Sequence, residues 1–168
     1  SPYIINAVGE WDQLKDQIIK KKINLINLSK SQFLYDVLPR YSYIKSRISY
    51  VIIFFFTILK LYNFLKSRSK QDIFVIHLIS SLPLLLIFFF NFKCKFILRI
   101  SGYPKLNFFR KLLWKLCKKK LSIILCPTED TKNNLISKNI FESKSFHVLY
   151  DPILDVKKIS LLKKEKIL

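Results

Sequence analysis

The chain has 168 residues, of which 51% are hydrophobic and 15% aromatic, so it can bury a core of its own and is not a disordered chain. Its 30 Lys and Arg residues against 11 Asp and Glu residues give a net charge of +19, which predicts a polyanionic neighbour such as nucleic acid, anionic lipid or a phosphorylated substrate. A genome whose codon bias favours Lys, Ile, Phe and Asn is an alternative source of the same excess, and both explanations stay open.

Strand-like and helix-like patterns alternate along the whole chain. The first part is expected to form a strand at 3–8, a helix at 11–22, a strand at 23–28 and, after a loop, a long helix at about 46–66. The second part is expected to form strands at 73–78, 95–100, 122–126 and 146–150, with helices at 81–90, about 107–119 and 128–138 between them. Pro83 suits the first turn of its helix, and Thr128 suits an N-cap followed by acids. This rhythm predicts an α/β fold, with a Rossmann-like parallel sheet covered by helices on both faces.

Two apolar stretches, 48–65 and 74–92, approach the length that crosses a bilayer. The second is interrupted by His77, two serines and Pro83, which suits a strand and a helix better than a span. The first carries Lys60 and Asn63 and has cationic flanks, which suits a helix lying on a bilayer or packed on a sheet. A small basic membrane protein with two spanning helices stays as an alternative.

The cysteines and the first residues indicate the cellular compartment of the protein. Cys94, Cys117 and Cys126 are odd in number and form no CxxC pair, so we expect reduced core residues, without a disulfide framework or a metal site. Residues 1–5 lack a Met, a basic region and a signal-type cleavage site, and they read as the interior of a longer, cytoplasmic protein.

In a parallel sheet the ligand crevice lies beyond the carboxyl ends of the strands. The residues expected there are Gly9, Glu10, His77, Ser80, Ser81, the run from Arg99 to Lys105, Thr128, Glu129, Tyr150 and Asp151. The sequence contains neither GxGxxG nor GxxxxGK[ST], which argues against a dinucleotide site and a nucleoside triphosphatase. It also lacks HExxH and a recognisable Ser/His/Asp arrangement, so hydrolase chemistry has no support.

Two groups of residues at the carboxyl ends of the strands have specific expected roles. Gly102 would let the backbone approach a ligand while Arg99 and Lys105 hold a phosphate, and an ordinary turn at the end of a strand is the alternative. His77 could act as a general base or donate a hydrogen bond to a sugar, and a core histidine is the alternative.

The helix at 107–119 is amphipathic and basic. Phe109, Leu112, Leu113 and Leu116 are expected to face the core. The cations expected on the opposite, membrane-facing side are Arg110, Lys111, Lys115, Lys118, Lys119 and Lys120. Such a face can dock on anionic lipid headgroups, and a merely solvated face is the alternative.

The run 74–84, FVIHLISSLPL, resembles the D-I-V-H-x-H-x…P strand and helix in the N-terminal domain of family 4 glycosyltransferases, which have the GT-B fold. Three later segments are similar to family segments in the same order. The run 95–102 resembles the next strand and its glycine turn, 121–135 resembles A-D-x-I-I-x-x-S/T-x-x-x-x-x-x-L, and 146–153 resembles K-I-x-V-I-x-N-G-V-D. Asp151-Pro152 stands where the family usually has Asn-Gly, and the family's first strand with its Gly-rich loop is absent.

The resemblance implies that 1–152 form an acceptor-binding domain and that 153–168 begin the interdomain linker or the second domain. The whole protein would be a retaining hexosyltransferase that moves a sugar from a nucleotide-sugar to a glycan or lipid-linked acceptor in cell-surface polysaccharide or lipopolysaccharide synthesis. The donor would bind mainly to a domain outside this chain, so this chain alone would be inactive and would hold no cofactor. Cytoplasmic, peripheral attachment to the inner face of the membrane is expected.

The same resemblance suggests roles for individual residues. His77 and Ser101 are the expected catalytic positions, and Ser101 stands where many members have a histidine. The expected acceptor-binding residues are Gly9, Glu10, Arg99, Gly102, Lys105 and Glu129. A non-catalytic protein that binds membrane surfaces is an alternative function. Nucleic acid is not expected as a partner, because the chain has no recognisable RNA-binding or helix-turn-helix signature.

Overall fold

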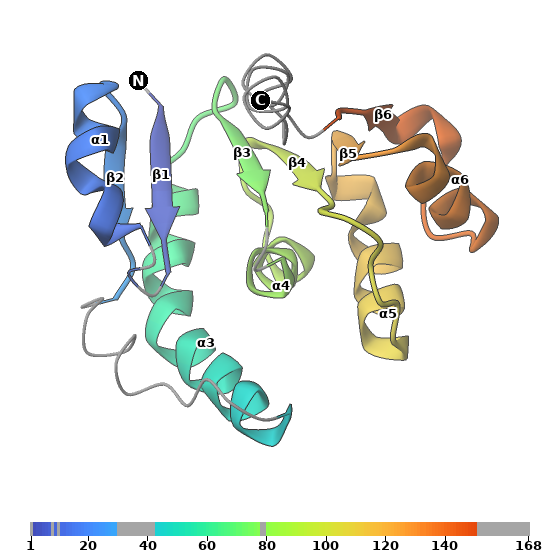
Figure 1. Ribbon diagram of the computed structural model, residues 1–168, viewed down its shortest axis with the longest axis horizontal. Helices are drawn as coiled ribbons and strands as arrows, with labels where there is room; N and C mark the ends of the chain where they lie inside the picture. Colours follow the sequence, from blue (N-terminus) through green and yellow to red (C-terminus); the bar gives the residue numbers. More distant parts are fainter. Residues whose placement is uncertain (1, 8, 10, 30–42, 78–79, 151–168) are drawn as a thin grey trace, which may run out of the picture. The chain divides into compact units, whose positions relative to one another are not determined.

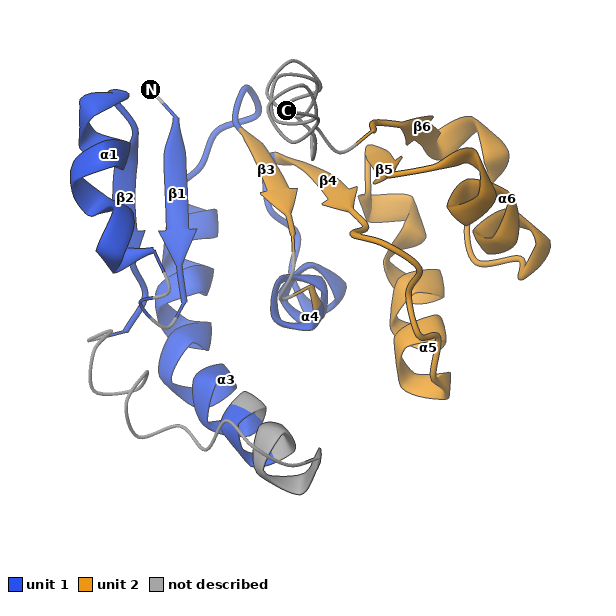
Figure 2. Ribbon diagram, in the orientation of Figure 1, with its two compact units in different colours: residues 1–72, 81–94 blue, residues 73–80, 95–168 orange. Residues whose placement is uncertain are grey.

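The computed structural model describes residues 2–7, 9, 11–29, 43–77 and 80–150, with side chains over the same ranges apart from 43–47 and 50. The chain divides into two compact units (Figure 2). Unit 1 comprises residues 1–72 and 81–94, and unit 2 comprises residues 73–80 and 95–168. The assignment of 1–152 to one acceptor-binding domain, with a linker after it, stays a prediction.

Unit 1 is built on a pair of parallel strands (Figure 1). Its elements are β1 (Tyr3–Asn6), the 3-10 helix η1 (Asp12–Leu14), α1 (Lys15–Lys20), β2 (Asn24–Asn27), α3 (Tyr43–Lys66) and α4 (Ser81–Phe89). Tyr3 lies opposite Asn24, and Asn6 lies opposite Asn27. Lys22 has a φ of 56°, a left-handed conformation that turns the chain from α1 into β2. The strands and helices expected in this part are therefore present; β2 and α1 are shorter than the pattern predicts, whereas α3 begins earlier, at Tyr43.

The long helix α3 buries one stripe and exposes another. Thr57, Leu61 and Leu65 are buried at a spacing of four residues, whereas Phe55 and Leu59 are exposed. The Thr57 hydroxyl donates to the Ile53 carbonyl at 2.6 Å, which satisfies a buried polar group within the helix. The buried stripe accounts for α3 as a packed helix of unit 1.

Helix α4 begins at Ser81, as predicted, with Pro83 in its first turn. A proline costs little there because the first N–H groups of a helix have no partner inside it. Five of its nine residues are buried, namely Leu82, Pro83, Leu84, Leu86 and Ile87. In the described part of the chain, no helix has both the length and the hydropathy needed to cross a membrane.

Unit 2 contains a four-stranded parallel sheet in the order β3-β4-β5-β6 (Figure 1). Its elements are β3 (Ile73–Ile76), β4 (Lys95–Arg99), α5 (Phe108–Cys117), η2 (Lys118–Lys120), β5 (Ile123–Cys126), α6 (Glu129–Ser137), η3 (Ser143–Ser145) and β6 (Phe146–Val148). Side chains such as Leu98 and Ile124 on neighbouring strands are in register and buried. The α/β fold with parallel strands is therefore confirmed.

The three cysteines are free and buried, as predicted. Burial in apolar surroundings raises the pKa of Cys117 to about 11 and that of Cys126 to about 11. Both thiols are thus protonated near neutral pH, and they act as small apolar core groups.

Helix α5 faces the core with a different side from the one that the sequence pattern suggests. Trp114 and Cys117 are buried, and the Trp114 ring lies 5.6 Å from that of Phe141, centroid to centroid. Phe109, Leu112 and Leu116 are exposed, so the prediction that they face the core is wrong. The physical reason is that Trp114, the largest apolar side chain of the helix, sets its rotation, although it is outnumbered by smaller apolar residues on the other side.

The cations of α5 are divided by the same rotation. Lys115, Lys118 and Lys119 are exposed, and their contact with a membrane stays a prediction. Arg110 and Lys111 are only half-exposed, and the Arg110 guanidinium donates to the Lys105 carbonyl at 2.8 Å. Arg110 and Lys111 are therefore less exposed than Lys115, Lys118 and Lys119.

Candidate functional site

The carboxyl ends of β3, β4, β5 and β6 share one edge of the sheet of unit 2, because the four strands are parallel. His77 follows β3 directly, and Ser101 and Gly102 follow β4. Thr128 and Glu129 follow β5, and Tyr150 follows β6. The described residues of unit 2 that were predicted for the crevice thus lie at or beyond this edge.

His77 and Ser101 form the one pair of predicted catalytic residues that the structure brings into contact. The His77 Nε2 and Ser101 Oγ atoms lie 2.6 Å apart, and both side chains are exposed. The expectation of a core histidine is therefore wrong. Which atom donates depends on the tautomer of the imidazole. In either arrangement, a nitrogen and a hydroxyl are presented together at the edge of the sheet, where they can hold a hydroxyl group of a ligand.

The turn after β4 requires a glycine for its backbone conformation. Gly102 has a φ of +60°, and a Cβ at this position would have no atom within 4 Å. Glycine is therefore favoured here by the positive φ of the turn and not by lack of space, because the space beside it is open. Lys105 is exposed, and its carbonyl is held by Arg110, while Arg99 is half-exposed at the last position of β4.

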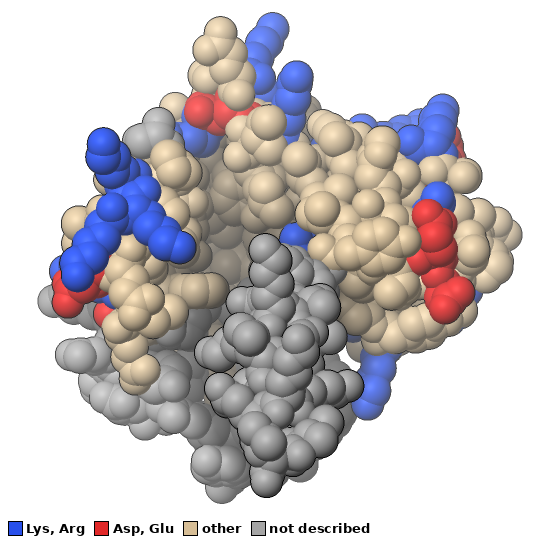
Figure 3. Space-filling view, turned by 45° about the horizontal axis from the view of Figure 1, so that its top comes forward, with Lys and Arg blue, Asp and Glu red and all other residues tan. Residues whose placement is uncertain are grey.

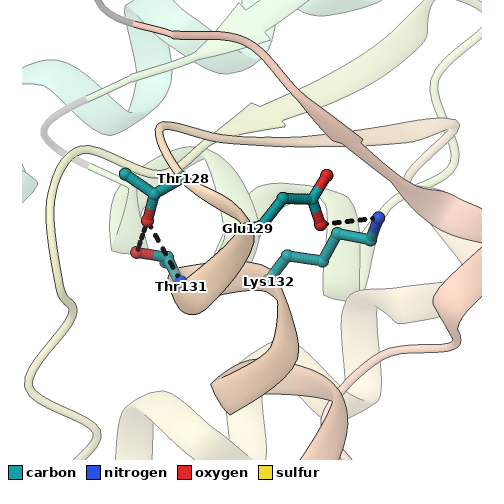
Figure 4. Close-up of polar contacts among 4 residues, drawn as sticks. All are labelled: Thr128, Glu129, Thr131 and Lys132. Carbon is teal, nitrogen blue, oxygen red and sulfur yellow. Dashed lines mark hydrogen bonds and ion pairs between the residues drawn. The ribbon is translucent and has the colours of Figure 1, made fainter.

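The start of α6 is capped as the sequence predicts (Figure 4). Thr128 Oγ1 accepts from the Thr131 backbone N–H at 3.2 Å and lies 3.0 Å from the Thr131 hydroxyl. The Glu129 carboxylate pairs with Lys132 at 3.1 Å, one turn further along the helix. Glu129 is thus engaged in an exposed ion pair, which neutralises it as a lone charge at this edge.

Replacement of Thr128 by alanine is expected to lower the free energy of unfolding by about 1 kcal/mol, because the Thr131 N–H in the first turn of α6 loses its acceptor. Urea denaturation measures the change. Thr128→Ser keeps the hydroxyl and should be close to wild type. An equal loss in both variants would argue against capping as the role of this side chain.

The carboxyl ends of β1 and β2 in unit 1 carry a second polar cluster. Asp12 Oδ1 accepts from Asn6 Nδ2 and from Asn27 Nδ2, both at 3.1 Å. Asn6 is completely buried, and its Oδ1 accepts from the Gly9 N–H at 3.0 Å. Gly9 has a φ of 88°, so this glycine shapes the turn that the amide of Asn6 holds. Glu10, predicted beside it, lies outside the described residues, as does Asp151.

Sequence reasoning missed this cluster, although a signal was present. Both strands end in Ile-Asn, as YIIN and NLIN, and asparagine is unusual at a position that is fully buried. The two amides converge on one carboxylate because they occupy paired positions of parallel strands. The cluster links the ends of β1 and β2 to Asp12 at the start of η1.

Asn6→Ala should lower the free energy of unfolding by about 2 kcal/mol, because the Gly9 N–H and the Asp12 carboxylate both lose the hydrogen bonds that the buried amide of Asn6 makes. Asn27→Ala removes a bond to the same Asp12 oxygen from an exposed position and should cost about 0.5 kcal/mol or less. Urea titration of both variants measures the difference. Similar losses would show that burial of Asn6 does not matter.

Comparison of the chain with protein-family models, with curated proteins and with solved structures found no match. The part of the family resemblance that the structure bears out is the α/β fold with parallel strands. Among the described residues, no group of three or more His, Cys, Asp and Glu side chains is placed to hold a metal ion.

Proposed function

We propose that this chain is the acceptor-binding half of a retaining glycosyltransferase. The observation that carries the proposal is the contact of His77 Nε2 with Ser101 Oγ at 2.6 Å, at the carboxyl ends of adjacent parallel strands. Ligands of open α/β sheets bind at such an edge. The order of the motifs along the chain, from the histidine strand to the glycine turn and the capped helix, supports the same assignment.

In the proposed reaction the acceptor hydroxyl lies against His77 and Ser101. Its oxygen forms a bond to the anomeric carbon of the donor sugar while the bond from that carbon to the diphosphate oxygen breaks, and the hydroxyl proton leaves with the nucleotide. The imidazole and the serine hydroxyl orient the acceptor oxygen by hydrogen bonds, which lowers the entropic cost of the transfer. Gly102 has no side chain and leaves space for the acceptor beside the turn, and Arg99 and Lys105 bind a phosphate of the acceptor.

The nucleotide-sugar binds mainly to a second domain of the complete protein, and the acceptor is a glycan or a lipid-linked glycan of the cell surface. The protein acts in the cytoplasm, at the inner face of the membrane. These assignments follow from the family resemblance, and the basic character of the chain supports an acceptor that carries phosphate.

The experiment is a transfer assay with the complete gene product that contains this chain. Radiolabelled nucleotide-sugars are incubated one at a time with the protein and with membranes from cells that lack the gene, and labelled glycan or glycolipid is measured. At least one sugar should be transferred, and His77→Ala should abolish most of the transfer. Absence of transfer from every common nucleotide-sugar would refute the proposal.

A further inference from the structure

Helix α5 presents large apolar side chains to solvent. Phe108 and Phe109 are 73% and 78% exposed, and Leu112 and Leu116 follow them on the same side of the helix. Their positions, at i, i+1, i+4 and i+8, form one outward stripe opposite the buried Trp114 and Cys117. A contiguous apolar patch of this kind marks a binding surface, whereas single exposed apolar residues are ordinary.

Exposed cations lie on the same helix and directly after it. Lys115 is three positions after Leu112 and is exposed, and Lys118 to Lys120 continue the chain from the end of α5 in η2. No acidic residue occurs between Lys105 and Lys120. The surface therefore combines aromatic and aliphatic side chains with several lysines.

A hollow of about 260 Å³ opens at the carboxyl end of α5. It is lined by Lys118, Lys119, Leu121, Phe141, Glu142, Lys144 and Ser145. Lys144 pairs with Glu142 at 3.0 Å, and the hydrogen bond from Lys144, followed by the charges of Lys144, Lys118 and Lys119, lowers the pKa of Glu142. The single carboxylate of Glu142 thus lies near the ammonium groups of Lys118, Lys119 and Lys144, and the lining of the hollow has a net positive charge.

We propose that the outward side of α5 and the adjoining lysine hollow dock on an anionic phospholipid bilayer. Phe108, Phe109, Leu112 and Leu116 enter the boundary between headgroups and acyl chains, as the apolar side of an interfacial helix does. Lys115, Lys118, Lys119 and Lys144 bind headgroup phosphates, and one phosphate occupies the hollow. Charge complementarity favours this partner. A protein partner would need carboxylates placed opposite these lysines, whereas an anionic leaflet carries negatively charged phosphates over its whole surface. Docking does not depend on the proposed sugar transfer.

The test measures sedimentation of the full chain with vesicles. Binding to phosphatidylcholine vesicles that contain phosphatidylglycerol should be strong at low salt, and binding to pure phosphatidylcholine should be weak. Each lysine near the surface contributes about fivefold, so the variant K118Q/K119Q/K144Q should bind about 100-fold less tightly. All three side chains are exposed, and circular dichroism verifies the fold.

The matched control is K15Q/K20Q/K21Q, which removes the same charge from α1 and the residue after it, in unit 1. This control is needed because Lys and Arg side chains project at several separate places on the surface (Figure 3). The α1 variant should keep most of the binding. Equal losses in the two triple variants would show that net charge alone attracts the vesicles, and would overturn the proposal.

Insertion of the apolar side chains has its own readout. Phe109→Trp should show a blue shift of its emission on addition of phosphatidylglycerol vesicles, and quenching by lipids with brominated acyl chains. An emission that does not move, together with saturation of the hollow by inorganic phosphate, would identify a site for free anions and overturn the proposal. Association of the chain with itself through Phe109 in the absence of lipid would also overturn it.

Discussion

Replacing Trp114 by alanine is expected to lower the free energy of unfolding by about 3–5 kcal/mol, which is the usual cost of removing a buried aromatic side chain. Trp114 is only 3% exposed, and its ring lies against that of Phe141, which in turn meets Phe146 edge-on at 5.6 Å. Alanine would leave a cavity between α5 and the end of the sheet that these rings fill. Urea denaturation followed by far-ultraviolet circular dichroism measures the loss.

Phe109→Ala on the same helix is the matched control. Its side chain is 78% exposed, so the free energy of unfolding should change by no more than about 0.5 kcal/mol. The apolar pattern of the sequence instead predicts a helix rotated so that Phe109 lies in the core and Trp114 lies outside it, and the larger loss of stability would then come from Phe109→Ala. A larger loss for Phe109→Ala than for Trp114→Ala would therefore show that α5 is rotated relative to the structure described.

Replacement of His77 by alanine should lower kcat/KM for the proposed sugar transfer by the complete protein about 100-fold or more, because the acceptor hydroxyl loses a side chain that positions its oxygen by a hydrogen bond. Ser101→Ala should have an effect of similar direction, since Ser101 Oγ fixes the imidazole at 2.6 Å. Neither side chain is buried, so the stability of the protein should hardly change. Transfer rates at several acceptor concentrations separate kcat from KM.

The other histidine of the chain provides the control. His147 lies in β6 with an exposed side chain, and it belongs to no part of the proposed site. His147→Ala should leave kcat/KM close to wild type. Equal losses for His77→Ala and His147→Ala would show that activity follows the general condition of unit 2 and not the contact with Ser101.

The strands and their order in the chain could be predicted from sequence, because buried parallel strands are continuous apolar runs. Residues 73–76 and 123–126 are such runs, and each is bounded by polar or turn residues. The starts of helices could also be predicted where the sequence carries a local signal, as with Pro83 in the first turn of α4 and Thr128 before α6. The ends of strands were harder to predict, since Ile100 is apolar and buried but lies one residue beyond the end of β4.

The candidate site was predicted in part. His77 and Ser101 each follow a strand that the sequence predicts, and the family resemblance suggests them as catalytic positions. Parallel strands bring such positions to one edge of the sheet. Their direct contact could not be read from the sequence, because it depends on the path of the turn around Gly102. The rotation of α5 was also beyond the pattern, because a helix with apolar residues on two sides has two possible core faces, and the choice depends on how Trp114 fits Phe141.

The most direct test of the proposed site is a double-mutant cycle on sugar transfer with His77→Ala, Ser101→Ala and the double variant. If the two side chains hold one acceptor hydroxyl as a unit, the double variant should lose little more than the about 100-fold loss of either single variant. If the losses multiply to about 10,000-fold, the residues act independently, and the account of a joint site at the ends of β3 and β4 is contradicted.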